Sequence, residues 1–297
     1  MSNRLQNDST QFTRVVPSTS QELRERLYRG ELFIFDATEE SRRLVDAVQL
    51  AVSEAFADHG EPRTVAHQIS PDLFFAIAGK LRKLFYKQPP FLQLVSNLIT
   101  SLNFAADRTG FDPARLRIVS PGGHNNPAAA AVYHGHRDTW YANPETMITW
   151  WIPLHDVDST NSFCFFPEQF DQEVNNDSEV FDLERWTAKD DKKLIGWQDK
   201  KTGLTAQYPQ LLEEPEGVQV PVQCHRGDIL LFSGQHLHRT YKQNTDLSRF
   251  SLDFRTVDLV DDQKGLGAPN VDNRSTGAWT KKFLSVAEVL AVDDRGN

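Results

Sequence analysis

The sequence predicts a mainly β fold, with a double-stranded β-helix (jelly roll) core supported by helices near the N-terminus. Two observations predict it. From Leu116 onward, short β-rich runs alternate with Gly, Asn, Asp and Pro, a pattern typical of many short strands joined by turns. The preceding residues instead carry apolar side chains at helical spacing. Several of the β-rich runs are apolar on both faces, as expected when one face packs in a two-sheet sandwich and the other against helices.

The chain begins with a polar lead over residues 1–20, which we expect to be flexible. Residues 21–27 (QELRERL) have leucines at helical spacing and predict a helix. The apolar run 32–35 (LFIF) predicts a short buried strand. The amphipathic stretch 41–56 predicts a second helix, because residues 36–40 before it include side chains that can cap a helix N-terminus.

Two more helical stretches follow, around residues 72–86 and 91–106. Pro89 and Pro90 lie between them, and proline interrupts helical continuation. Residues 21–110 are therefore predicted to form a mainly helical N-terminal part.

The predicted jelly-roll core spans residues 115–258 and belongs to a single domain over 21–297, which ends in a helical tail at 278–291. A charged, turn-rich insertion at 168–217 interrupts the core. We expect either a substrate-binding lid or a solvated surface loop there, since charged runs usually indicate exposure. The predicted strands are the runs RIVS, AAVYHGH, MITWWIPL, SFCFF, VQVPVQC, DILLFSG and RFSLDFRTVDL.

Composition excludes several classes of partner. The formal net charge of −9 would repel a phosphate backbone, so a nucleic-acid partner is not expected. No apolar stretch is long enough to cross a bilayer, and the N-terminus lacks the apolar core of a signal peptide, so we expect a cytoplasmic protein without a membrane partner. Cys164 and Cys224 lack metal-type spacing and are interpreted as buried free thiols, with a disulfide between them as the alternative.

The stretch HGHRDTW, residues 134–140, contains a candidate metal site. His136 and Asp138 are two residues apart and would share one face if the segment is extended. Alone, such a pair is a weak signal. A second region supports it, because His238 follows a β-rich run and a glycine turn in RGDILLFSGQHLHRTY. Two histidines and one carboxylate form a facial triad that holds iron(II) with open positions for a co-substrate and oxygen.

Arg249 and Ser251 would share one face of the last predicted strand. Arginine presents a planar fork of donors that matches a carboxylate, so this pair suits the distal carboxylate of 2-oxoglutarate. Thr240, two residues after His238, offers a further hydroxyl. Trp151 is the preferred aromatic wall of the pocket, although aromatic residues in strands most often belong to the core.

Neighbouring residues compete for these roles. His134 shares the expected face of His136 and is interpreted as lining the site without binding the metal. His236 likewise shares the face of His238. Arg137 would be unfavourable beside a metal ion, so we expect strand alternation to turn it away, toward an acidic neighbour on the outer face.

The order His136-x-Asp138, His238, Arg249-x-Ser251 resembles the iron(II)/2-oxoglutarate dioxygenases, and more closely the phytanoyl-CoA dioxygenase-like family. LYRGELFIFDATEE, WWIPLHDVDSTNSFCFFPEQF and RGDILLFSGQHLHRTYKQN carry the same resemblance. It favours His238 over His236 as the distal ligand, both by the count from Gly227-Asp228 and by the 11-residue spacing to Arg249. The chain departs from the family after Pro167, where Glu-Gln-Phe replaces the usual Gly-Ser-His.

The resemblance implies a cupin-like jelly roll and an enzyme that uses iron(II), 2-oxoglutarate and O2 to hydroxylate an unactivated carbon of a small-molecule metabolite, with release of succinate and CO2. It further suggests natural-product tailoring. The carboxylate of Asp138 favours hydroxylation, because related halogenases have a small residue there. Desaturation, cyclisation and epimerisation stay open as outcomes, and the sequence leaves the oligomeric state undecided. The alternatives are a cupin-type metalloenzyme that does not use 2-oxoglutarate and a non-catalytic jelly-roll binding protein.

Overall fold

The computed structural model describes residues 11–125, 132–184, 208–242 and 245–293 of the chain. Helices and strands follow in this order: β1 Phe12–Thr13, α1 Ser20–Tyr28, β2 Leu32–Phe35, α2 Glu39–Phe56, α3 Pro71–Lys87, α4 Pro89–Ser101, β3 Thr109–Phe111, β4 Arg115–Val119, β5 Ile148–Pro153, β6 Phe163–Phe165, β7 Val220–Pro221, β8 Ile229–Ser233, β9 His238–Thr240, β10 Arg249–Asp258, α6 Leu259–Gln263, β11 Leu284–Ser285 and α7 Val286–Asp293.

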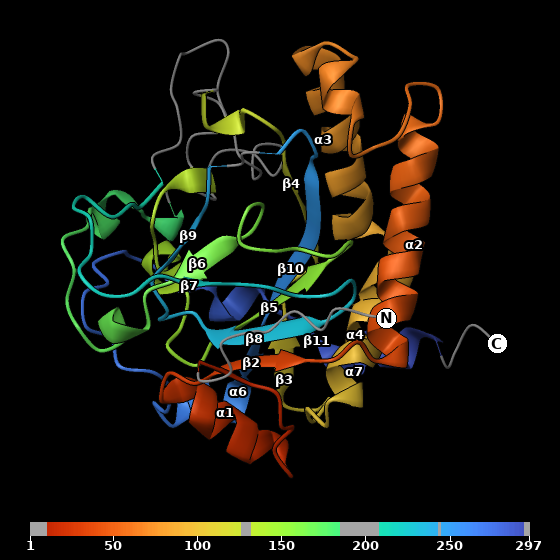
Figure 1. The fold of residues 1–297 in the computed structure, drawn as a ribbon. Coiled ribbons are helices and arrows are strands. Elements are labelled where there is room, and N and C mark those ends of the chain that lie inside the picture. The colour runs from red at the N-terminus through yellow and green to blue at the C-terminus, as the bar shows by residue number, and fades with distance from the viewer. Residues whose placement is uncertain (1–10, 126–131, 185–207, 243–244, 294–297) are drawn as a thin grey trace.

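The strands form two sheets, and the predicted jelly-roll class is confirmed. The larger sheet has the order β1-β2-β8-β5-β10-β3-β11, with β4 also paired to β10, and the smaller sheet has the order β7-β6-β9. Only the β1–β2 pair is parallel among the described strand pairs. Figure 1 shows the smaller sheet lying over one face of the larger one.

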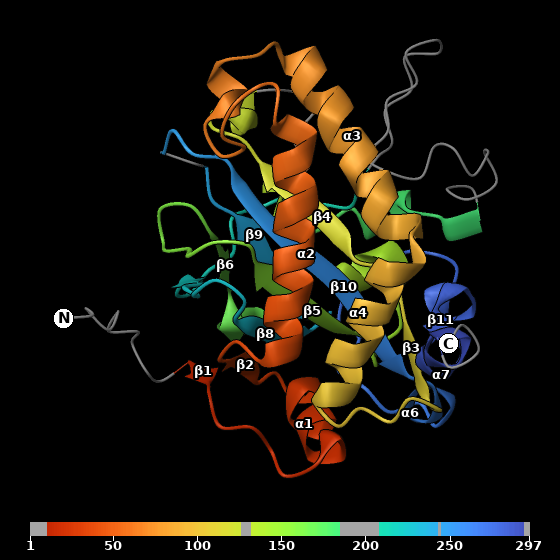
Figure 2. The same ribbon diagram turned by 90° about the vertical axis from the view of Figure 1, so that its right-hand side faces the viewer.

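Helices α2, α3 and α4 cover the other face of the larger sheet (Figure 2). Strand alternation explains this arrangement. Along β10, Phe250, Leu252 and Phe254 belong to the main apolar core that the helices also fill. Arg249 and Ser251 alternate with them, so they face the smaller sheet. A second apolar core, which includes Trp151 and residues of β6 and β8, lies between the sheets.

The N-terminal helices begin where polar side chains cap them, as expected from the sequence. Thr19 accepts a hydrogen bond from the Glu22 amide at the start of α1. Thr38 and Ser41 bond reciprocally to each other's backbone amides at the start of α2, which satisfies two amides that have no intrahelical partner. β2, whose residues are all buried, pairs with β8 in the larger sheet.

The helix boundaries near the prolines differ from those expected. α3 ends at Lys87, just before the prolines, so the expected interruption is confirmed. Pro89 and Pro90 themselves form the first turn of α4, which therefore begins two residues earlier than expected. Proline is tolerated there because the backbone N–H that it lacks would have no intrahelical partner at that position. α4 also ends at Ser101, well before the expected residue 106. Asn103 adopts a left-handed conformation with φ of 63°, which stops the helix.

Two of the predicted strands differ from expectation. Of the run AAVYHGH, residues 132–136 form no extended strand, and only His136 makes an isolated bridge. The remainder of that run, residues 130–131, lies outside the described residues. In VQVPVQC, only Val220–Pro221 forms a strand and Cys224 makes a separate bridge to Val157.

The ends of the chain also differ in part from expectation. Residues 12 and 13 form β1, so the expected flexible lead over 1–20 is wrong there, and residues 1–10 lie outside the described range. The tail expected to be helical over 278–291 contains the short strand β11 before α7. No helix among the described residues is long and apolar enough to span a membrane. Both cysteines are buried free thiols, as expected.

Candidate metal centre

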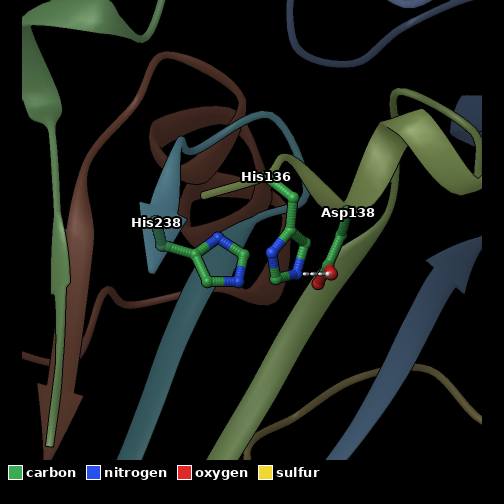
Figure 3. Close-up of side chains that lie close together, drawn as sticks. All are labelled: His136, Asp138 and His238. Carbon is green, nitrogen blue, oxygen red and sulfur yellow. Dashed lines mark ion pairs between the residues drawn. The ribbon is translucent and has the colours of Figure 1, made fainter. Parts of the chain in front are cut away.

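His136, Asp138 and His238 come together in space (Figure 3). One ligand atom from each lies within 4.8 Å of the others, and the figure shows the two imidazole rings and the carboxylate side by side. His136 Nε2 lies 3.7 Å from Asp138 Oδ1, and the two ring centroids are 4.4 Å apart. Within the described part of the chain, no other cluster of three His, Cys, Asp or Glu side chains meets this geometry.

The backbone places the two histidines opposite each other. The His136 amide donates to the His238 carbonyl and the His238 amide donates to the His136 carbonyl, both at 3.0 Å. Residues that exchange two such bonds are directly opposite across an antiparallel pair, so their side chains project from the same face. The isolated bridge therefore positions the two histidines in the way expected of a longer strand.

Each imidazole is held in the form that can bind a metal. Nδ1 of His136 lies 3.0 Å from the His134 carbonyl oxygen, and Nδ1 of His238 lies 2.9 Å from the His236 carbonyl oxygen. Because a carbonyl only accepts, each Nδ1 carries the hydrogen and Nε2 keeps its lone pair. Burial and the neighbouring His238 lower the pKa of His136 to about 4, so this ring is neutral at neutral pH.

Asp138 begins a short 3-10 helix, Asp138–Tyr141, rather than continuing a strand. The residue before it is still extended, which keeps the Asp138 side chain on the same side as His136. The Thr149 hydroxyl donates to Asp138 Oδ2 at 2.7 Å, and Arg255 Nη2 lies 3.6 Å from Asp138 Oδ1. Sequence reasoning missed Thr149 and Arg255, although Arg255 lies on the same face of β10 as Arg249 by strand alternation.

Arg137 turns away from the metal centre, as expected, but it does not reach the outer surface. Its side chain is fully buried and forms an ion pair with Asp272, with Nε 3.1 Å from Oδ2. It also donates to the backbone carbonyls of Gln169, Gln172 and Gln235. The expected acidic partner is therefore present, but its expected place on the outer face is wrong, because described residues of the insertion and of the C-terminal loop cover this side.

Arg249 and Ser251 lie on the inner face of β10, and both are buried. Arg249 Nη1 donates to the Asn161 carbonyl at 3.3 Å. Neither Arg249 Nε nor the Ser251 hydroxyl has a hydrogen-bond partner among the described residues. Burial lowers the pKa of Arg249 to about 10, so the guanidinium stays cationic at neutral pH. A buried cation beside an unpartnered hydroxyl fits an anionic ligand.

Trp151 lies near this pair, and the pairing of β9 with β6 places Thr240. The guanidinium carbon of Arg249 is 5.9 Å from the Trp151 ring centroid and 6.0 Å from that of Phe163. Trp151 is buried between the sheets, against Phe163. Thr240 is directly opposite Phe163 in the β6–β9 pair, so it shares the face of His238.

The competing histidines have other surroundings. His236 is buried, with Nδ1 3.1 Å from the Ser233 carbonyl oxygen and Nε2 3.1 Å from that of Gly30. Burial lowers its pKa to about 4. His134 is half-buried and borders an open pocket of about 270 Å³, and it does not belong to the group of converging ligands. The pocket is lined by Tyr133, His134, Gly135, Leu211, Leu212, Glu213, Glu214 and Arg239.

The described parts of the 168–217 insertion pack beside the metal centre. Leu211 donates its amide to the Gly135 carbonyl at 2.7 Å. Phe181 and Tyr208 both contact the ring of Tyr141, which itself contacts His136 at a centroid distance of 5.6 Å. Residues 185–207 lie outside the described range, so the choice between a lid and a surface loop stays a prediction.

The Glu-Gln-Phe sequence after Pro167 closes the base of this insertion. Glu168 accepts from the Val218 amide at 3.3 Å, and the Gln169 side chain donates to the Glu216 carbonyl at 2.9 Å. Phe170 packs on the His236 ring. The departure from the family pattern therefore joins the two ends of the insertion and leaves the triad untouched.

Two imidazole nitrogens and one carboxylate oxygen are the donor set of a facial iron(II) site, so the three residues fit that ion. The fit rests on the convergence of the donors, on the hydrogen-bonded Nδ1 atoms and on the neutral state of His136.

Comparisons with known proteins place the chain beside several solved structures and one protein family. Among solved structures, the chain is similar to EvdO2 from Micromonospora carbonacea var. aurantiaca, with 13% identity, a TM-score of 0.46, and coverage of 83% of this chain and 94% of that one. It is also similar to the non-heme alpha ketoglutarate dependent epimerase SnoN from nogalamycin biosynthesis, with 15% identity, a TM-score of 0.41, and coverage of 90% and 99%. These likenesses are too distant to inform the function. No curated protein matches the chain.

The family comparison is decisive. The model of the family described as phytanoyl-CoA dioxygenase (PhyH) matches residues 14–251, which is more than half of the chain and includes the triad, Arg249 and Ser251. The chain therefore belongs to the phytanoyl-CoA dioxygenase family.

Proposed function

We propose that this protein is a non-haem iron(II)/2-oxoglutarate-dependent oxygenase in which His136, Asp138 and His238 bind the iron. Arg249 and Ser251 bind the distal carboxylate of 2-oxoglutarate. The observation that carries the proposal is the combination of the converging triad with a buried, cationic Arg249 whose Nε has no partner among the described residues. Iron and 2-oxoglutarate would together supply oxygen activation coupled to release of succinate and CO2.

The chain's own residues would bind and orient the reactants. Two imidazoles and one carboxylate would occupy one side of the ion and leave the other positions for ligands. Arg249 would set the direction of 2-oxoglutarate by pairing with its far end, while Trp151 and Phe163 exclude water around the guanidinium. Thr240 would add a hydroxyl on the same face as His238.

The reaction we propose is hydroxylation of an unactivated carbon in a small-molecule metabolite, in biosynthetic tailoring. The presence of Asp138 supports hydroxylation over halogenation, because halide binding needs the position that this carboxylate takes. The aromatic contacts from His136 through Tyr141 to Phe181 and Tyr208 support an organic substrate beside the metal. Desaturation, cyclisation and epimerisation stay open as outcomes of the same chemistry.

The first experiment is an anaerobic titration of iron(II)-loaded protein with 2-oxoglutarate, which follows the visible metal-to-ligand charge-transfer band. Wild type should develop the band, and Arg249→Ala should need a higher concentration of 2-oxoglutarate to reach it. A missing band in fully iron-loaded wild type would contradict the proposal and favour a cupin-type metalloenzyme or a binding protein.

The triad is tested by His136→Ala and Asp138→Ala. Each variant should bind iron(II) at least about 100-fold more weakly and should release no succinate, because only two of the three protein ligands remain. His134→Ala is the matched control, since this histidine is a neighbour in sequence outside the triad. Equal iron binding in the triad variants and in the control would overturn the ligand assignment.

A further inference from the structure

Thr149 and Arg255 reach Asp138 from two neighbouring strands. They are directly opposite each other in the β5–β10 pair, so their side chains project from the same face of the larger sheet. The Thr149 hydroxyl donates to Asp138 Oδ2 at 2.7 Å, and Arg255 Nη2 lies 3.6 Å from Oδ1. Each carboxylate oxygen therefore has its own neighbour, and both neighbours belong to the rigid centre of the sheet.

The two contacts differ in kind. At 2.7 Å the Thr149 hydroxyl makes a strong hydrogen bond, which restrains the rotation of the carboxylate and uses one lone pair of Oδ2. At 3.6 Å Arg255 is too far from Asp138 for a hydrogen bond. It therefore offsets the negative charge of the carboxylate and leaves the lone pairs of Oδ1 available to a metal ion. Oδ1 is also the oxygen that lies 3.7 Å from His136 Nε2.

Other carboxylates hold Arg255 in place. Its Nη1 lies 3.2 Å from Asp112 Oδ2 and its Nη2 lies 3.7 Å from Asp253 Oδ2. Asp253 is in turn bound by Arg117 through two hydrogen bonds of 2.6 and 3.0 Å. Because these partners share the guanidinium, Arg255 cannot swing fully onto Asp138.

We infer that Thr149 and Arg255 are positioning residues that make Asp138 a one-oxygen ligand of the metal. This inference rests on the proposed function. A carboxylate that bound through both oxygens would take one of the positions that a facial triad leaves open for co-substrate and oxygen. Thr149 prevents this by holding Oδ2 on the sheet, and residues that orient a ligand in this way change metal affinity by about 10–100-fold when they are removed.

Thr149→Val tests the inference, because valine keeps the shape of threonine and removes only the hydroxyl. We expect iron(II) affinity, measured anaerobically by calorimetry, to fall at least about 10-fold. We also expect the charge-transfer band formed with 2-oxoglutarate to shift or weaken. Thr149→Ser restores the hydroxyl and should return both values to within about threefold of wild type.

Thr146→Val is the matched control. Thr146 is also buried and its hydroxyl bonds a carboxylate, Asp262 Oδ1, at 3.2 Å, yet Asp262 is outside the triad. This variant should bind iron and form the band as wild type does.

The outcomes separate the two proposals. Wild-type protein that binds no iron(II) would overturn the proposed function and the inference with it. If wild type binds iron and Thr149→Val binds it equally well with an unchanged band, the inference alone is wrong. It is also wrong if Thr149→Ser is as defective as Thr149→Val, because the hydroxyl would then not be the cause.

Discussion

Arg137 and Arg249 are both almost completely buried, with exposed fractions of 0% and 3%, yet their surroundings differ. Arg137 pairs with Asp272 and donates to three backbone carbonyls. Arg249 donates to one carbonyl, faces two aromatic rings, and has no carboxylate within ion-pair distance among the described residues. Arg137 is bonded within the fold, whereas Arg249 has donors left for a ligand.

The two arginines differ in how many of their N–H donors have a partner within the fold. A guanidinium offers five N–H donors, and burial makes each unpaired donor costly. The donors of Arg137 are used within the fold, which joins the segment that carries His136 and Asp138 to the insertion and the C-terminal loop. Arg249 keeps donors that the described chain does not use, as expected of a residue that binds an anionic ligand.

The largest expected effect is on Arg137. Arg137→Met should lower the free energy of unfolding by about 3–5 kcal/mol, because it leaves Asp272 buried without its cation. Chemical denaturation measures this change. Arg43→Met, which removes an exposed ion pair with Glu39, is the control and should change stability by less than about 1 kcal/mol. A similar small loss in both variants would remove the contrast on which the comparison rests.

Arg249→Met should have the opposite result in the ligand-free protein. We expect the free energy of unfolding to stay unchanged or rise by about 1 kcal/mol, because an unpaired buried charge is replaced by an apolar side chain. At a 2-oxoglutarate concentration 100 times its Kd, iron-loaded wild type should gain about 2.7 kcal/mol of stability, and most of this gain should be lost in the variant. A ligand-free variant destabilised as strongly as Arg137→Met would show that Arg249 is structural.

Ser251→Ala should have the smallest effect. Loss of one hydrogen bond of about 0.5–1.5 kcal/mol should raise the concentration of 2-oxoglutarate needed for half-saturation about 2- to 10-fold. Ser96→Ala is the matched control, because this α4 serine is equally buried and its hydroxyl also lacks a partner among the described residues. If the two variants titrate alike, Ser251 does not contact the co-substrate.

The fold was predictable where a local sequence pattern is compatible with only one type of secondary structure. The buried strand LFIF, the capped helix over 41–56 and the long β10 all appear as expected. Local patterns failed where proline and glycine-rich context permits two outcomes. Pro89 and Pro90 form the first turn of the second helix rather than a linker before it, and the run before His136 is a turn with one bridge rather than a strand.

The residue types and order of His136, Asp138, His238 and Arg249 were determined by the sequence, because ligand chemistry depends on the side chain and strand alternation sets which neighbours share a face. Only the tertiary structure decided what surrounds them. Thr149 and Arg255 reach Asp138 through strand pairing, and Asp272 reaches Arg137 from far along the chain. Such contacts depend on the register of paired strands and on the loops that cover the core. Neither can be deduced from local sequence patterns, because both bring together residues that are far apart in the chain.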